Sequence, residues 1–163
     1  MLDAKTRALI LASPWLFLLH EYEEYRTGVP WLKANIDTIP SCLRAHLPTS
    51  PNAFLFGGLL FFVVYVIAGY LATRPVAKRW TLVLFAVLIL ARLENALTHL
   101  AQFILLRRYT PGIITALIVV LPVCVALVSR FAKFKYIERR AWFALAAAAM
   151  VVQVLAIGMI LSS

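Results

Sequence analysis

The chain contains 163 residues, of which 63% are apolar and only 14% are charged, and its mean hydropathy is +0.89. Soluble domains usually contain about 45–50% apolar and about 25% charged residues. A soluble fold of this length would expose much of the apolar excess to water, so the composition excludes a soluble globular protein. The length leaves room for one membrane-embedded domain that covers residues 1–163.

The net charge of +9 raises the question of nucleic-acid binding. The Lys and Arg residues lie in short segments between apolar runs, however, and not in one continuous basic region. In membrane proteins such residues set the orientation of the helices and contact lipid headgroups. We therefore expect membrane lipid as a partner and no nucleic acid.

Five apolar stretches approach the roughly 20 residues that a membrane-spanning helix requires. They cover residues 6–25, 53–73, 80–106, 112–130 and 141–161. The sequence thus predicts an all-α, polytopic membrane bundle of about five transmembrane helices.

The segment 26–52, between the first two predicted helices, contains Pro30, Pro40 and Pro48. It is too polar to span a bilayer and too rich in proline for one continuous helix. Loops of this length often have a function of their own. We expect either a solvated connector or a lid over a site.

The basic residues that flank the predicted helices are distributed unequally between the two sides of the membrane. Ten lie on the side of the N-terminus: Lys5, Arg7, Arg74, Lys78, Arg79, Arg130, Lys133, Lys135, Arg139 and Arg140. Five lie on the other side: Arg26, Lys33, Arg44, Arg107 and Arg108. Because basic residues accumulate on the cytoplasmic side, this distribution predicts a cytoplasmic N-terminus and a C-terminus outside.

Ionisable groups within the predicted helices are costly, by roughly 2.5–3.5 kcal/mol each at a helix centre, and usually serve a function. The first helix ends in His20-Glu21-Tyr22-Glu23-Glu24, which contains three of the seven acidic residues of the chain. At about 100° per residue, His20, Glu23 and Glu24 lie within an arc of about 100°, and Glu21 lies at its edge. One helix face therefore presents an imidazole and two carboxylates.

The third predicted helix carries a second polar stripe. Arg92, Asn95, His99 and Gln102 lie within an arc of about 80°, which we expect to face the interior of the bundle. Both helices run outward, and His99 lies roughly 10 Å below the outer surface. The two clusters are thus predicted at a similar depth.

A site of this composition suits a metal ion. His20 and His99 with Glu23 or Glu24 provide the mixed nitrogen and oxygen ligands of catalytic zinc, and we assign Glu24 as the ligand. Glu23 remains as a general base, and Arg92 and Asn95 can stabilise developing negative charge. Zinc is the favoured metal, with iron or manganese as alternatives. A site without metal, a solvated helix end and a structural role for Arg92 stay open.

Three short motifs occur in a fixed order: H-x-x-E-E at 20–24, N-x-x-x-H at 95–99 and Y-x-P-G at 109–112. In this order they resemble the HXXEE-domain family of prokaryotic integral membrane proteins, from about Leu11 to beyond Leu121. The resemblance implies a multi-pass protein of a prokaryotic cytoplasmic membrane with an enzymatic activity. It adds Tyr109 as a catalytic candidate. Pro111 and Gly112, with Gln102, become candidates for substrate binding.

The function expected from these residues is that of a metal-dependent membrane hydrolase or group-transfer enzyme with a lipid-like or amphipathic substrate. The site would lie in the outer half of the bilayer. A metal-free acid–base enzyme in which Glu23 and Glu24 share a proton is one alternative. A proton- or cation-coupled transporter that uses the same Glu and His residues is another alternative. Because five spans without an inverted repeat do not suit a monomeric transporter, this alternative favours a homo-oligomer. A di-iron oxidase and an accessory membrane subunit are weaker alternatives.

Overall fold

The computed structural model describes residues 2–39, 41–44, 47–48 and 50–161, and within these ranges every regular element is a helix. In chain order the elements are α1 (Ala4–Ala34), the 3₁₀ turn η1 (Ile36–Thr38), α2 (Ser41–Arg44), α3 (Pro51–Thr73), α4 (Arg79–Leu106), α5 (Ile113–Thr115), the π-helical η2 (Ala116–Val120), α6 (Leu121–Lys133) and α7 (Ala141–Leu161). The predicted all-α bundle is confirmed.

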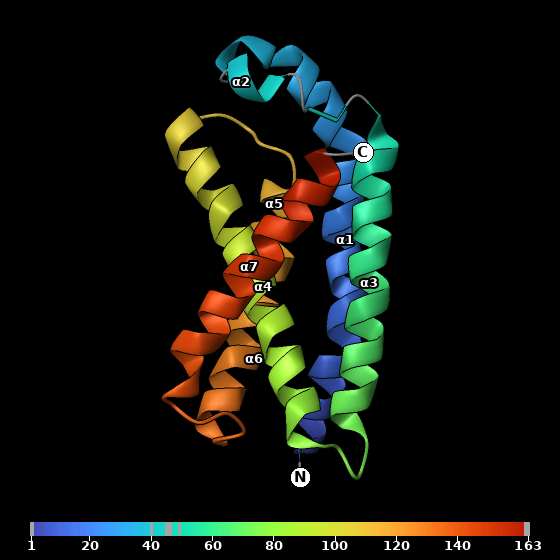
Figure 1. Cartoon of the computed structure of the whole chain (residues 1–163), viewed down its shortest axis with the longest axis vertical. Helices are drawn as coiled ribbons and strands as arrows, with labels where there is room; N and C mark the ends of the chain where they lie inside the picture. The colour runs from blue at the N-terminus through green and yellow to red at the C-terminus, as the bar shows by residue number, and fades with distance from the viewer. Residues whose placement is uncertain (1, 40, 45–46, 49, 162–163) are drawn as a thin grey trace.

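Three helical segments are long and apolar enough to cross a membrane: Leu55–Thr73, Arg79–Leu106 and Ile113–Lys133. A shorter apolar stretch covers 141–155 in α7. These spans make the chain an integral membrane protein. The predicted orientation stays a prediction, as do membrane crossings by α1 and α7. The two termini lie at opposite ends of the bundle (Figure 1).

The predicted end of the first helix at residue 25 is wrong, although segment 26–52 does not form one continuous helix, as its prolines predicted. Helix α1 continues to Ala34 with Pro30 inside it, so residues 26–34 are helical. Proline removes one helical hydrogen bond, but contacts beyond it hold this end in place. The Trp31 indole donates to the carbonyl oxygen of Tyr109 at 2.7 Å, and Asn35 donates to the carbonyl oxygen of Trp31 at 2.8 Å. A lid formed by the rest of the segment stays a prediction.

The predicted fourth helix corresponds to α5, η2 and α6, which follow one another without a break. In η2 the helix widens, and the Leu121 N–H bonds to the carbonyl oxygen of Ala116, five residues back. This wide turn directly precedes Pro122, which has no N–H to continue the usual pattern. The widening lets the helix pass a proline and still lie against its neighbours.

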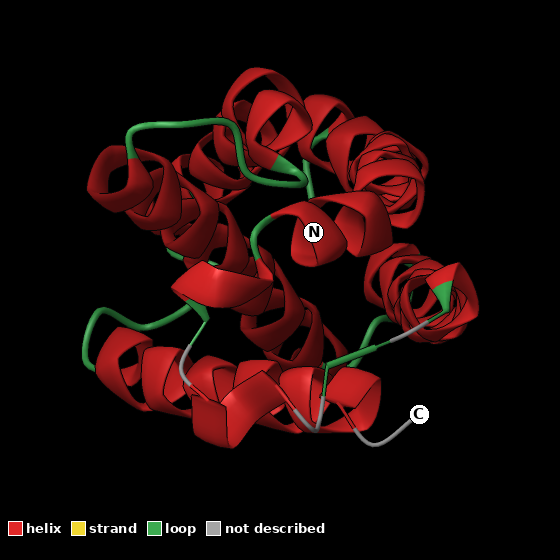
Figure 2. Ribbon diagram, turned by 90° about the horizontal axis from the view of Figure 1, so that it is seen from above, coloured by secondary structure: helices red, strands yellow, loops and turns green. Residues whose placement is uncertain are grey.

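Helix α4 lies in the middle of the bundle and contacts α3, α6, η2 and α7, while α1 packs mainly against α3 (Figure 1). Viewed along the long axis, the helices pack around one another, and short loops connect them (Figure 2). The largest fully buried apolar side chains are Ile10, Tyr65, Phe85, Ile89, Leu127 and Phe131. Phe17, Tyr65 and Phe85 form edge-to-face ring contacts with centroid distances of 5.5 and 6.3 Å. This aromatic core joins α1, α3 and α4.

The first residues of α1 are tied to the end of α6. Asp3 caps α1 by accepting a hydrogen bond from the backbone N–H of Thr6 at 3.1 Å. Arg130 forms an ion pair with Asp3 and donates to Thr6 Oγ1 at 2.7 Å. The hydrogen bonds from Thr6, together with Arg130, hold the pKa of Asp3 well below its ordinary value.

We expect Asp3→Asn to lower the midpoint of thermal unfolding in detergent at pH 7. A carboxylate whose pKa is lower in the folded state stabilises the fold above its unfolded pKa of about 3.9, and this contribution is lost as the pH falls below that value. The difference between wild type and Asp3→Asn should therefore shrink below about pH 4. Asp37→Asn, at an exposed position in η1, is the matched control and should leave the midpoint unchanged.

Candidate metal centre

Two helices bring the predicted ligands together in the bundle interior. His20 and Glu24 lie one turn apart in α1, and His99 lies in α4. Glu24 Oε1 is 3.1 Å from His99 Nε2 and 3.9 Å from His20 Nε2. One potential ligand atom from each of the three residues lies within 4.8 Å of the other two. His20 is fully buried and His99 is 7% exposed, so this group is a built cluster and not a solvated helix end.

A chain of hydrogen bonds fixes the orientation of the His20 ring. Thr115 Oγ1 donates to Glu23 Oε2 at 2.6 Å and lies 3.0 Å from His20 Nδ1. Because the Thr115 hydrogen is used by Glu23, the Thr115 oxygen accepts the proton of His20 Nδ1. His20 Nε2 then carries the lone pair and faces the cluster, which is the tautomer that a metal ligand needs.

Asn95 contacts both imidazoles. Its Nδ2 lies 3.0 Å from His20 Nε2 and 3.2 Å from His99 Nε2. Gln153 of α7 donates to Asn95 Oδ1 at 2.8 Å and so directs the amide nitrogen towards the histidines. Three long helices, α1, α4 and α7, therefore contribute to one polar network.

The carboxylate of Glu23 is bound by the segment that contains the Y-x-P-G motif. It accepts hydrogen bonds from the Tyr109 hydroxyl at 2.9 Å, the Ile114 N–H at 3.3 Å and the Thr115 N–H at 2.8 Å, besides the Thr115 hydroxyl. A carboxylate at the first turn of a helix satisfies N–H groups that have no helical partner. Glu23 thus fastens α5 to α1, which is a positioning role and leaves it no free oxygen lone pair directed at the cluster.

Gly112 packs directly against the ligands. Its φ of +82° lies in the left-handed region, where glycine is strongly favoured. A Cβ at this position would lie 2.7 Å from His20 Cε1 and 2.9 Å from His99 Cε1. The third motif therefore contacts the first two, and a side chain at 112 would displace both histidines.

Arg92 forms an ion pair with Glu21, which is not one of the three potential ligands. Its guanidinium lies 5.2–6.0 Å from the ring centroids of Phe17, Phe61 and Tyr65. These contacts correspond to the structural role that the sequence left open, and they do not favour the predicted stabilisation of negative charge. Gly58 leaves room for the pair, since a Cβ there would lie 2.6 Å from Glu21 Oε2.

The remaining predicted residues lie around the cluster at different distances from it. Pro111 is half-buried in the turn before α5, and Tyr109 is 37% exposed at the edge of the cluster. Gln102 is exposed on α4 and lies outside the polar network, because the helix has turned away from α1 at this level.

Sequence reasoning gave no role in the site to three partners in this network: Glu21, Thr115 and Gln153. Glu21 lay at the edge of the predicted polar face, and Thr115 stands in an apolar run with no motif of its own. Gln153 carried the one available signal, since it is the only strongly polar residue in the last predicted helix.

A family described as "Protein of unknown function with HXXEE motif" matches residues 11–127 of the sequence. The match covers more than half of the chain, and the chain therefore belongs to this family. No curated protein and no solved structure matches the sequence. The three motifs that suggested the family are the same three that meet around His20 and His99.

We expect Gly112→Ala to destabilise the fold by at least about 1–2 kcal/mol, the cost of a left-handed conformation for a residue with a Cβ. The close approach to both histidine rings should add to this loss. The free energy of unfolding in detergent measures it. Gly158→Ala is the matched control, because a Cβ at 158 would meet nothing within 4 Å. Equal stability of the two variants would contradict the close packing of Gly112.

We expect Arg92→Met and Glu21→Met each to destabilise the protein by about 3–5 kcal/mol, since either change leaves one charge unpaired in the apolar bundle. The double variant should lose less than the sum of the two single changes. Arg79→Met tests an exposed ion pair with Glu138 for comparison, and should cost about 1 kcal/mol or less. Additive losses at Arg92 and Glu21 would show that the two residues do not interact.

Proposed function

We propose that this HXXEE-family protein is a metal-dependent membrane enzyme that hydrolyses, or transfers a group from, a lipid-like or amphipathic substrate. The observation that carries the proposal is the buried convergence of His20, Glu24 and His99 from two helices. Two imidazoles and one carboxylate are the protein ligands found in a class of catalytic zinc sites. Iron and manganese accept the same donor types.

The distances support a tetrahedral ion. With ligand bonds of about 2.0–2.1 Å, neighbouring ligand atoms of a tetrahedral zinc lie about 3.3 Å apart. Glu24 Oε1 and His99 Nε2 are 3.1 Å apart, close to this value. Glu24 Oε1 and His20 Nε2 are 3.9 Å apart, and all three ligand atoms lie within 4.8 Å of one another, so His20 would move inward to bind the same ion. The donor set therefore fits the ion that we propose.

The surroundings of His20 support the same assignment, whereas His99 Nδ1 is buried without a hydrogen-bond partner. Metal-binding histidines usually donate their second ring N–H to a hydrogen-bond acceptor, which orients the ring. Thr115 provides this acceptor for His20 and is itself held by Glu23. Thr115 and Glu23 would thus orient the first ligand without binding the metal themselves.

Three protein ligands leave one position of a tetrahedral ion for water or substrate, and this distinguishes catalytic from structural zinc. A bound divalent ion would polarise the substrate and make water a stronger nucleophile. The amide N–H of Asn95, which lies within 3.0–3.2 Å of both histidine Nε2 atoms, would meet negative charge that develops on a substrate oxygen.

The depth of the cluster suggests the class of substrate. His99 is seven residues before the end of α4, so the cluster lies roughly 10 Å from that end of the helix. A molecule with its polar group at this depth and its apolar part among membrane helices is amphipathic. The half-exposed Tyr109 and the turn to Gly112 lie beside the cluster, where such a substrate would enter.

One observation favours a metal-free acid–base enzyme as the second candidate. The separation of 3.1 Å between Glu24 Oε1 and His99 Nε2 is also that of a direct hydrogen bond. Such a pair can pass a proton to and from a substrate without a metal. Metal analysis distinguishes the two candidates.

We expect near-stoichiometric zinc, iron or manganese in detergent-purified wild type, measured by mass spectrometry of the metal. His20→Ala, His99→Ala and Glu24→Gln should lose it, and Thr115→Val should weaken metal affinity about 10–100-fold, as removal of a hydrogen-bond partner of a ligand does. Gln102→Ala, exposed on the same helix as His99, is the control and should keep the metal.

A wild type that takes up none of the three metals, even when they are supplied during purification, would overturn the metal site. The acid–base candidate would then be preferred, and Glu24 and His99 would remain the residues to test. Metal retained in His20→Ala and His99→Ala would instead place the ion elsewhere in the chain.

A further inference from the structure

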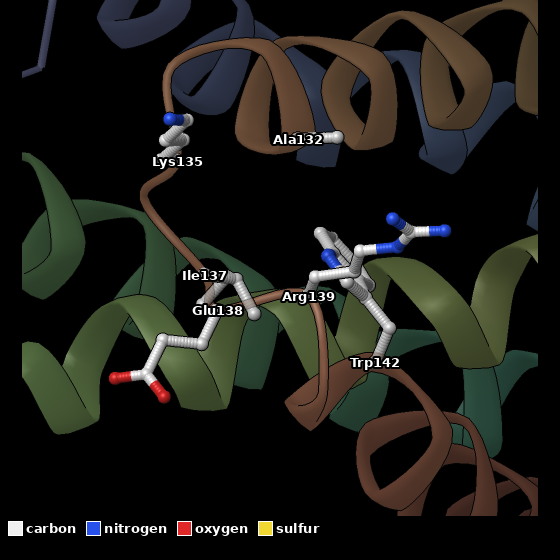
Figure 3. A pocket seen from close by; sticks show the side chains of 6 residues that line it. All are labelled: Ala132, Lys135, Ile137, Glu138, Arg139 and Trp142. Atoms are coloured by element: carbon white, nitrogen blue, oxygen red, sulfur yellow. The ribbon is translucent and has the colours of Figure 1, made fainter.

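A second site lies at the other end of the bundle, in the connection between α6 and α7. This connection borders an open pocket of about 510 Å³, lined by Ala132, Lys135, Ile137, Glu138, Arg139 and Trp142 (Figure 3). The volume is within the roughly 300–1,000 Å³ of small-molecule sites. Arg79, which pairs with Glu138 at this pocket, is twenty residues before His99 in α4, or about 30 Å along the helix. The pocket is therefore separate from the proposed metal centre.

The lining combines an apolar surface with cationic groups. Ile137 is buried and Trp142 is half-buried, and both line the pocket (Figure 3). Lys135 and Arg139 are exposed and provide the cations. A ligand that uses the whole pocket must carry both an apolar part and an anionic group.

The one acidic residue of the pocket does not cancel these charges. The Glu138 carboxylate forms ion pairs with Arg79 and Arg140, and it points away from Lys135 and Arg139 (Figure 3). The hydrogen bonds from Arg79 and Arg140 keep the pKa of Glu138 below its ordinary value. Glu138 is thus an ionised group whose partners are already in place.

Lys135 has a positive φ, which is unusual for a residue other than glycine. Helix α6 ends with two hydrogen bonds, from the Lys135 N–H to the carbonyl oxygen of Ala132 and from the Tyr136 N–H to that of Phe131. In this type of helix end the residue with positive φ is usually glycine, yet Lys135 has a φ of +52°. Residues held at positive φ cost stability and cluster at binding sites, so Lys135, which also lines the pocket, is a candidate ligand-binding residue.

The end of the bundle that contains the α6–α7 connection is strongly basic, which also favours an anionic ligand. Ten basic residues lie in the segments that flank this end: Lys5, Arg7, Arg74, Lys78, Arg79, Arg130, Lys133, Lys135, Arg139 and Arg140. The acidic side chains there, Asp3 and Glu138, are both held in ion pairs. Basic pockets between helices at a membrane surface bind the headgroups of anionic lipids, and tryptophan is enriched at that level.

We propose that the pocket between α6 and α7 binds an anionic phospholipid. Lys135 and Arg139, the two unpaired cations among the residues that line the pocket, attract its phosphate from different sides. The apolar part of the lipid lies against Trp142 and Ala132. The lipid thereby joins α6 to the start of α7 through the pocket, so binding should also stabilise the fold.

The test is titration of the detergent-purified full chain with phosphatidylglycerol or phosphatidylcholine, followed by native mass spectrometry and thermal unfolding. Wild type should bind phosphatidylglycerol more tightly and unfold at a higher temperature with it. Lys135→Gly should weaken this binding about fivefold, the effect of one surface cation on attraction to anionic lipid. Without lipid it should be at least as stable as wild type, because glycine relieves the positive φ.

Arg107→Gly is the matched control. Arg107 has a φ of +51° at the end of α4, away from the pocket, so this change removes the same charge and the same strain. It should leave binding of phosphatidylglycerol unchanged. Arg139→Gln should weaken binding as Lys135→Gly does.

Three results would overturn the proposal. The first is equal binding of the two lipids, and the second is an equal effect of Lys135→Gly and Arg107→Gly. The third is loss of bound phosphatidylglycerol in millimolar inorganic phosphate without loss of the stabilisation, which would show that the pocket recognises a free anion and not a lipid.

Discussion

The three carboxylates of the H-x-x-E-E segment each have a partner outside α1, and that requirement organises the site. The H-x-x-E-E segment of α1 carries three carboxylates within four residues, and they go to three different places. Glu21 pairs with Arg92, Glu23 binds the first turn of α5, and Glu24 meets His99. Since an unpaired charge is expensive in lipid, α1 can pack in only one rotation and at one height. The position of His20 follows from these three contacts.

The other two motifs provide the residues that contact His20 and Glu24 of α1. The N-x-x-x-H motif supplies the residues that face His20 across the bundle, and the Y-x-P-G motif closes the space above them. Gly112 allows the backbone to approach both imidazoles, and three residues later Thr115 orients one of them. Loss of any one contact would move the others, which explains why short and individually weak patterns occur together. Together the three motifs place one nitrogen each of His20 and His99 close to a carboxylate oxygen of Glu24.

Much of this arrangement could be predicted from the sequence because helix length and direction are local properties. The expected helices 53–73 and 80–106 differ from α3 and α4 by two residues or fewer at each end. The meeting of α1 and α4 followed from their parallel direction and the matched depth of their polar residues. The rotation of α1 could not be predicted, so Glu21 and Arg92 were not paired with each other. The continuation of α1 past Pro30 depends on Trp31 and Tyr109, which are far apart in the sequence.

The balance of charge around His20 gives an independent reason to expect an ion. Glu21, Glu23 and Glu24 contribute three negative charges, and Arg92 contributes one positive charge. If both imidazoles are neutral and all three carboxylates are ionised, these groups sum to a net charge of about −2 in an apolar bundle. Hydrogen bonds and the start of α5 satisfy Glu23, but they do not remove its charge. Either protons or a divalent cation must supply the balance, and the lone pair of His20 Nε2 faces the position where a cation would contact Glu24 and His99 as well.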